Sequence, residues 1–250
     1  MDPQAAINKI IAAHGGTDFW NGIQSLEAEI STSGLLFTFK RRPVLDHVRI
    51  TADAHRPHFV FHDFPSPGMI GELVGGQKVR IVSDDGAVVQ QRDNPRSAFK
   101  KMRRIFAWDD LDFIYFGGYA TWNYLVTPFI FLQKGFHFEV LDPVKVAASS
   151  WCRLKATMPD DLPTHCRTQI FYFDENWYLR RLDYVAEVVG SWAHAAHFCD
   201  NYQDFDGLKA PTYRRVRPIL LTDKPLPAPI LVALDIHNIM PVSGATDRIN

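Results

Sequence analysis

The sequence has little of what marks a disulfide-bonded, zinc-binding or membrane-spanning protein. It contains only three cysteines, widely spaced and without a C-x-x-C pair, so neither a disulfide framework nor a structural zinc site is expected. Buried thiols in a reducing compartment explain them best. No apolar run approaches the roughly 20 residues of a membrane-spanning helix. The net charge is −1, so no overall basic field favours nucleic acid or an anionic membrane.

Targeting and catalytic motifs are also missing. The first residues have neither the basic segment nor the apolar stretch of a signal peptide, so we expect a cytoplasmic protein. There is no G-x-S-x-G nucleophile motif, and the glycine pairs match no phosphate-binding loop or dinucleotide fingerprint, so no cofactor is expected. His194 and His197 would share a face on a helix, but the alternation around them favours a strand, where they point to opposite faces. We therefore expect no metal site.

Aromatic residues, in contrast, are abundant, with 18 Phe, 8 Tyr and 6 Trp. They are densest in residues 107–140, a composition typical of the lining of a ligand cavity or a deep core. Gly117, Gly118 and Pro128 interrupt this segment and predict two helices, or a helix and an irregular wall, in place of one long helix. The residues expected to line the cavity are Trp108, Tyr115, Phe116, Tyr119, Trp122, Tyr124 and Phe129.

Most of the remaining chain alternates apolar and polar residues with a period of two, which predicts antiparallel strands with one apolar face. An Asp-Gly turn at residues 84–86 predicts a hairpin between strands 78–83 and 87–92. In chain order we expect a helix over 3–14, β-sheet over 26–92, a helical aromatic insert over 95–133, β-sheet over 136–237 and a flexible tail over 243–250. No linker divides the chain, so we expect a single domain over 1–250. The predicted fold is mainly β (α+β), a single curved antiparallel sheet or open half-barrel of about ten to twelve strands wrapping two or three helices.

The C-terminal third contains a familiar pattern, FYFD at 171–174, LRRLDY at 179–184 and YQDFDGLKAP at 202–211. It resembles the closing strands of the outer-membrane lipoprotein-carrier superfamily over residues 164–220. This resemblance implies a curled antiparallel half-barrel that wraps helices and holds an acyl chain or lipid. Periplasmic carriers of this kind have a signal peptide, which the start of this sequence does not show. Residues 122–129 also resemble a W-N-Y-L-x-x-P-F core of bacterial proteins, which implies no function.

Polar side chains on the predicted C-terminal strands supply the candidate chemistry. If adjacent strands align, alternation brings one set onto a common face, namely His165, Arg167, Arg181, Asp183 and Arg215. A concave face of this kind would bind a carboxylate or enolate, and Asp183 with a histidine would provide acid–base groups. The alternative is an outward face of paired arginine and aspartate side chains.

A short basic cluster, KKMRR at residues 100–104, stands apart from the otherwise balanced charge. It is either a solvated loop or helix end or a contact for a phosphate or headgroup, and the solvated interpretation is favoured.

Three hypotheses for function follow. The first is a protein that binds a hydrophobic small molecule or lipid in the aromatic cavity, with any polar end held by Arg181, Arg215 or His165. The second is a cofactor-independent isomerase, cyclase or hydratase that acts on an apolar substrate, with His165, Asp183 or His194 as acid–base groups. The third is a protein-interaction module in which the aromatic residues are core and a sheet edge binds the partner. The sequence leaves open whether the protein is an enzyme.

Overall fold

A computed structural model describes residues 1–220 and 224–244 of the chain. The thirteen strands of the described part form one antiparallel sheet, in the order β6-β5-β4-β3-β2-β1-β13-β12-β11-β10-β9-β8-β7. The strands are β1 (Ile23–Ser33), β2 (Leu45–Asp53), β3 (Phe59–His62), β4 (Met69–Val74), β5 (Lys78–Ser83), β6 (Val88–Asp93), β7 (His137–Val146), β8 (Ser149–Thr157), β9 (Thr168–Phe173), β10 (Leu179–Val185), β11 (His194–Phe205), β12 (Leu208–Pro218) and β13 (Val232–Ser243).

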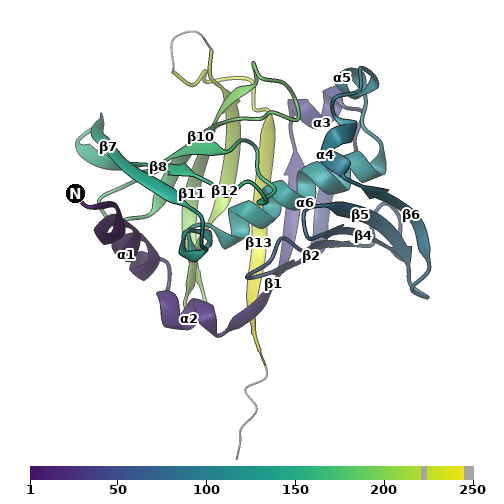
Figure 1. Cartoon of the computed structure of the whole chain (residues 1–250), viewed down its shortest axis with the longest axis horizontal. Coiled ribbons are helices and arrows are strands. Elements are labelled where there is room, and N and C mark those ends of the chain that lie inside the picture. The colour runs from purple at the N-terminus through teal and green to yellow at the C-terminus, as the bar shows by residue number, and fades with distance from the viewer. Residues whose placement is uncertain (221–223, 245–250) are drawn as a thin grey trace, which may run out of the picture.

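The sheet curls around the long helix α6 (Asp110–Val126), which lies in its concave face (Figure 1). It ends at β6 on one side and at β7 on the other, and these edge strands do not pair with each other within the described residues. The result is an open half-barrel, which confirms the predicted fold class with a strand count slightly above the expected one. The hairpin predicted around the Asp-Gly turn is β5–β6.

The helices are more numerous than predicted. Residues 1–220 and 224–244 contain six α-helices and one 3₁₀ helix, and five of these seven helices have only four or five residues. Helices so short span little more than one turn, so they show no helical period in the sequence. The others besides α6 are α1 (Pro3–Ala13), α2 (Thr17–Asn21), α3 (Leu35–Phe39), α4 (Pro95–Ala98), α5 (Arg103–Phe106) and η1 (Phe129–Leu132).

Helix α6 is continuous through the glycine pair, so the predicted break there is wrong. A Cβ atom added to Gly117 would lie 3.1 Å from the Phe61 ring, and one on Gly118 would lie 3.2 Å from the Leu73 side chain. The two glycines therefore let the helix pack closely against β3 and β4. Asp109 caps the helix and exchanges side-chain hydrogen bonds with the backbone at Asp112, forming a capping box.

Helix α3 interrupts the region predicted to be sheet over residues 26–92. Its amides at Leu35 and Leu36 donate to the carbonyls of Ile230 and Leu231, at 3.1 and 3.0 Å, which places the helix beside the start of β13. Gly34 precedes it with a φ of 126°, and an added Cβ would lie 2.5 Å from the Leu231 carbonyl oxygen, so only glycine fits.

Both ends of the described chain pack against the sheet or extend it. The first helix, α1, buries Ala6, Ile7, Ile10 and Ile11. Strand β13 continues to Ser243, and residues 245–250 of the predicted flexible tail lie outside the described residues. None of the described helices combines the length and the apolar character that a bilayer crossing requires.

Candidate functional site

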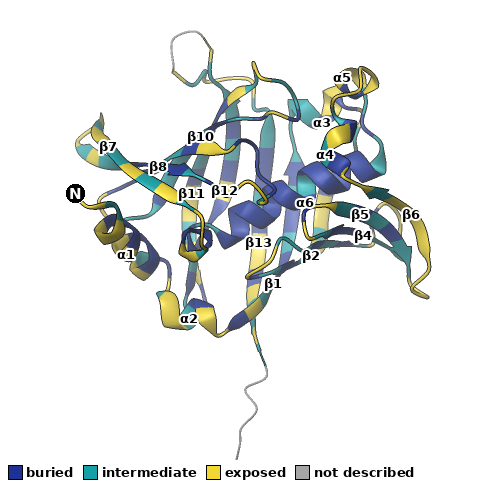
Figure 2. Cartoon of the chain, viewed as in Figure 1, coloured by how far each residue is buried: buried dark blue, intermediate teal, exposed yellow. Residues whose placement is uncertain are grey.

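The aromatic residues expected to line a cavity all lie in the interior of the half-barrel. Trp108, Tyr115, Phe116, Tyr119, Trp122, Tyr124 and Phe129 are each buried. Figure 2 shows α6 buried along nearly its whole length, as expected for a helix enclosed by the concave sheet. These rings pack on one another and on the sheet, as in the stack of Phe129 on Trp20 at 4.2 Å between ring centroids. The helix therefore fills most of the concave side.

A small void remains between α6 and the sheet. Its volume is about 20 Å³, and side chains of α3, α6, β1, β2, β3 and β13 line it. Phe37 of α3, Phe61 of β3 and Tyr124 of α6 contribute to this apolar lining. A space of this size holds about one water molecule, so an acyl chain would enter only if neighbouring side chains moved.

A fully buried histidine from the loop before β9, His165, packs against the C-terminal half of α6. His165 Nδ1 is 3.1 Å from the Tyr119 hydroxyl and Nε2 is 2.7 Å from the Tyr124 hydroxyl, and its ring stacks on Tyr184 with centroids 4.1 Å apart. Either tautomer satisfies both contacts, because a tyrosine hydroxyl both donates and accepts. Burial, and secondly the Arg96 charge, lowers the pKa of His165 to about 3. The ring is neutral near pH 7 and holds three tyrosines together.

Three buried histidines make the fold sensitive to acid. Burial lowers the pKa of His14 to about 4 and that of His165 to about 3, and burial beside Arg214 lowers the pKa of His197 well below its usual range. Between pH 6.5 and pH 4 the unfolded chain therefore binds more protons than the folded one, so stability falls as the pH falls. For His14 and His165, the lowered pKa values correspond to a loss of about 2 kcal/mol each between pH 6.5 and pH 5, which urea unfolding at the two pH values will measure.

A matched pair of variants tests whether the buried histidines cause this loss of stability in acid. His197 has no hydrogen-bond partner on either ring nitrogen, so His197→Leu removes a titrating group without breaking a hydrogen bond and is expected to recover part of the loss at pH 5. His194→Leu, which makes the same substitution at an exposed position on the same strand, serves as the control. Equal pH dependence of both variants and the wild type would contradict the explanation.

A buried cation, the Arg214 guanidinium, lies beside Tyr124. Arg214 of β12 is 2 % exposed and forms no ion pair with a described carboxylate. Its Nη2 donates to the Tyr124 carbonyl at 2.8 Å and its Nη1 contacts the Cys199 sulfur at 3.3 Å, while Nε has no partner. The Tyr124 carbonyl belongs to the last turn of α6, where carbonyls lack helical partners, so Arg214 also caps this helix. Most of its five N–H groups nevertheless remain unused.

His197 and Arg214 both contact the Tyr124 ring. The His197 ring meets Tyr124 edge-on at 4.3 Å between centroids, and the Arg214 guanidinium lies 5.4 Å from the centre of the Tyr124 ring. Since Tyr124 also lines the void, unsatisfied nitrogen atoms lie one side chain away from the interior space. Buried polar groups without partners are costly, and here they occur together.

Of the five polar residues expected on one face, Arg181, Asp183 and Arg215 do share a face, because Arg181 and Arg215 both align with Phe198 of β11 and Asp183 lies two residues from Arg181 on β10. Arg181 pairs with Asp183 at 2.6 Å, and Arg215 pairs with Asp235 at 2.8 Å. All four of these side chains are partly exposed, whereas the adjacent residues Leu182 and Arg214, which point to the other face of the sheet, are buried. The outward face of paired charges, which the sequence analysis kept as the alternative, is the arrangement observed for these two arginines.

His165 and Arg167 do not lie on this common face. Strand β9 begins only at Thr168, so both residues lie in the preceding loop, where period-two alternation does not apply. His165 points into the interior, while Arg167 pairs with Asp160 at 2.8 Å on the surface.

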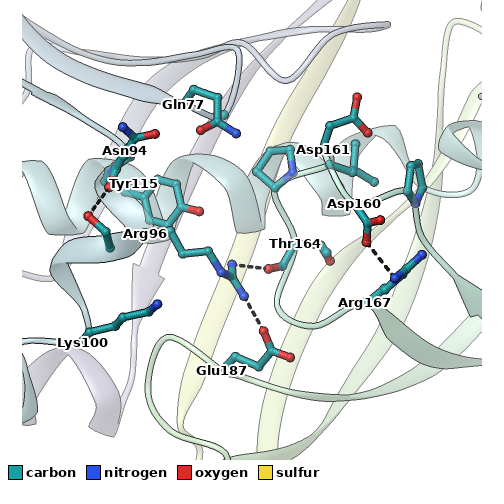
Figure 3. A pocket seen from close by; sticks show the side chains of 16 residues that line it. Gln77, Asn94, Arg96, Lys100, Tyr115, Asp160, Asp161, Thr164, Arg167 and Glu187 are labelled. Carbon is teal, nitrogen blue, oxygen red and sulfur yellow. Dashed lines mark hydrogen bonds and ion pairs between the residues drawn. The ribbon is translucent and has the colours of Figure 1, made fainter.

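A larger, polar pocket of about 450 Å³ lies near that loop (Figure 3). Arg96 crosses it, donating to the carbonyls of Thr164 and His165 at 2.7 and 3.2 Å and pairing with Glu187 at 2.7 Å. Both acidic and basic side chains line the pocket, and those of Arg96 and Arg167 are already paired. This arrangement ties α4 to the loop before β9 and selects no ligand charge.

The three candidate acid–base residues lie in three different environments. His165 is enclosed by tyrosines, Asp183 is held by Arg181 and by the Tyr172 hydroxyl at 2.8 Å, and His194 is exposed at the start of β11. No pair of them is in contact within the described residues. The sequence did not single out Arg214 as a site residue, because both faces of β12 carry arginine, and it offered His197 only as a possible metal ligand.

Comparison with solved structures identifies the fold. The chain is similar to a LolA superfamily protein from Nitrosomonas europaea (TM-score 0.55, 11 % identity, 100 % of this chain and 97 % of that chain). It is also similar to a domain from Vibrio parahaemolyticus described as an outer membrane lipoprotein-sorting protein (TM-score 0.53, 10 % identity, 98 % and 96 % covered). A DUF1329 family protein from Desulfovibrio piger matches as well (TM-score 0.51, 14 % identity, 99 % and 96 %).

These likenesses confirm the predicted resemblance at the level of the fold, which is the LolA-like half-barrel. No protein-family model matches the sequence, and no curated protein does either.

Proposed function

We propose that this protein binds a lipid or other hydrophobic small molecule whose apolar part lies between α6 and the sheet and whose acidic end contacts Arg214. The observation that carries the proposal is the buried Arg214, which has unused donors and no described carboxylate partner, and which contacts Tyr124, a residue that lines the interior void. An arginine fork matches a carboxylate or phosphate and binds it through charge-assisted hydrogen bonds.

The surroundings of the void suit an apolar chain. The concave side is lined by aromatic rings, and the open half-barrel leaves its two edges unjoined. The likeness to a protein described as lipoprotein-sorting adds support, since a lipoprotein carries acyl chains. The enzyme alternative has weaker support, because its three candidate residues do not converge.

Uptake of an acyl chain requires the void to grow, and α3 is the element best placed to move. It has only five residues, and its buried residue Phe37 forms part of the wall of the void. Edge-to-face and tilted contacts join Phe37 to Phe116 and Phe113 of α6. A ligand that displaces Phe37 therefore gains a channel along α6 toward Tyr124.

Titration with a fluorescent polyene fatty acid, parinaric acid, and with its methyl ester tests the proposal. Saturable binding of one molecule per chain, tighter for the acid than for the ester, is the expected result. No saturable binding of either compound would refute the proposed function, and equal affinity for both would refute the role of Arg214.

Phe37→Ala is expected to bind parinaric acid several-fold more tightly than the wild type. Removing the ring enlarges the void and spares the ligand the cost of displacing Phe37, at a stability cost of about 3–5 kcal/mol in the empty protein. Fluorescence titration gives the affinity, and urea unfolding with and without ligand gives the stability.

The control is Phe39→Ala on the same helix, where the ring is 66 % exposed. It should change stability by no more than about 0.5 kcal/mol and leave the affinity unchanged. If the two variants bound the probe equally well, the void beside Phe37 would not be the ligand site.

A further inference from the structure

Two neighbouring segments expose an unusual number of large apolar side chains. We call them the α3–α5 tip, which consists of residues 38–44 and 100–106. Phe39, Val44, Met102, Ile105 and Phe106 are 66, 62, 77, 61 and 66 % exposed, respectively. They account for five of the thirteen large hydrophobic residues that the described part of the chain exposes. Exposed apolar side chains that gather in one place mark an interaction surface.

The two segments of the tip are fixed to each other. The ammonium group of Lys40 is buried and donates to the carbonyls of Arg104 and Ile105, at 3.0 and 2.7 Å. The Trp108 amide in turn donates to the Lys40 carbonyl at 3.1 Å. Figure 1 shows α3 and α5 side by side at one end of the half-barrel, and Figure 2 shows α5 as largely exposed. The tip is therefore a built surface that projects from one end of the sheet.

The charge around these apolar side chains has one sign. Arg41, Lys100, Lys101 and Arg103 are exposed within the tip, and residues 34–44 and 98–107 contain no aspartate or glutamate. The whole chain has a net charge of only −1, so this concentration is local. Solvation alone, the interpretation that the sequence favoured for the KKMRR cluster, accounts for the cations but not for the apolar residues between them.

We infer that the α3–α5 tip docks on the surface of an anionic lipid bilayer. Apolar side chains enter the boundary between headgroups and acyl chains, while the surrounding lysines and arginines meet the anionic headgroups. The charge complementarity favours this partner over neutral lipid. Docking does not depend on the proposed function, but it would bring the membrane next to the void, because Phe37 and Phe39 belong to the same short helix.

Sedimentation with vesicles tests the inference. The protein is mixed with vesicles of phosphatidylcholine containing about one-third phosphatidylglycerol, or of phosphatidylcholine alone, at low and at 0.5 M salt (roughly a 4 Å screening length). At low salt we expect at least tenfold tighter binding to the anionic vesicles than to the neutral ones. High salt should weaken this binding several-fold, since the cations are exposed.

Variants locate the surface. Ile105→Asp combined with Phe106→Asp is expected to weaken binding to anionic vesicles at least tenfold. The control combines Leu132→Asp and Met240→Asp, which introduce the same charges at exposed apolar positions on η1 and near the end of β13, and should bind several-fold more tightly than the tip variant. Near-ultraviolet circular dichroism verifies that both variants are folded.

Hydrogen exchange of the wild type provides a measurement that needs no variant. Backbone amides of residues 100–106 should exchange several-fold more slowly when anionic vesicles are present. The inference is overturned if the wild type does not bind these vesicles, if the tip variant binds as well as its control, or if protection appears elsewhere. If the wild type does not bind anionic vesicles, an acidic protein becomes the partner that the charge of the tip would fit. Parinaric acid titration without vesicles tests ligand binding separately, so failure of docking and failure of the proposed function are distinguishable.

Discussion

Arg214→Met is expected to abolish the preference for parinaric acid over its methyl ester, with a loss of affinity for the acid of about tenfold to a hundredfold. Hydrogen bonds to a charged group are worth about 1.5–3 kcal/mol, which corresponds to this range of dissociation constants. Affinity for the ester should change little, because the ester carries no charge for the guanidinium to bind. Fluorescence titration of both compounds measures the two effects in one protein.

The neighbouring residue supplies the control. Arg215 is the same residue type on the same strand, but its side chain is partly exposed and pairs with Asp235 at 2.8 Å. Arg215→Met should therefore keep the preference for the acid. Since Arg214 also caps α6 through the Tyr124 carbonyl, stability must be measured in parallel. A folded Arg214→Met protein that still prefers the acid would contradict the assignment of the headgroup site.

Asp112→Ala is expected to destabilise the fold by about 3–5 kcal/mol, the usual cost of breaking a buried ion pair. Asp112 is fully buried, pairs with Arg92 at 2.7 Å and with Arg104 at 2.5 Å, and completes the capping box of α6. Without its carboxylate, two arginines would lose a partner and the helix would lose half of its N-terminal cap. Urea unfolding measures the change.

Asp110→Ala makes the same chemical change in the same turn of α6. The Asp110 side chain is 35 % exposed and pairs with Arg42, so the expected cost is about 1 kcal/mol or less. Similar costs for the two variants would show that the Asp112 network does not anchor α6 in the sheet.

The fold was predictable from the sequence because its main features leave local patterns. Alternation over many residues identified the antiparallel strands, and the Asp-Gly turn located the β5–β6 hairpin. The short helices leave no such pattern, and α3 depends on Gly34 and on backbone hydrogen bonds to residues 230 and 231, almost 200 residues away. The glycine pair of α6 was misjudged because it serves close packing against Phe61 and Leu73, a tertiary contact.

The candidate site was only partly predictable, for related reasons. The aromatic residues were assigned to the interior because their density along the chain indicates burial. The buried cation was missed by one position, because Arg214 and Arg215 lie on opposite faces of β12 and alternation alone does not say which face is concave. His165 was placed on the wrong kind of element, since strand β9 starts three residues after it.

Mass spectrometry of small molecules released from the freshly purified, denatured protein tests the central claim most directly. We expect close to one acidic amphiphile per chain, with a long apolar part and a carboxylate or phosphate group, and a large reduction of this molecule in Arg214→Met. A protein that releases no such molecule and also fails to bind parinaric acid would contradict the account.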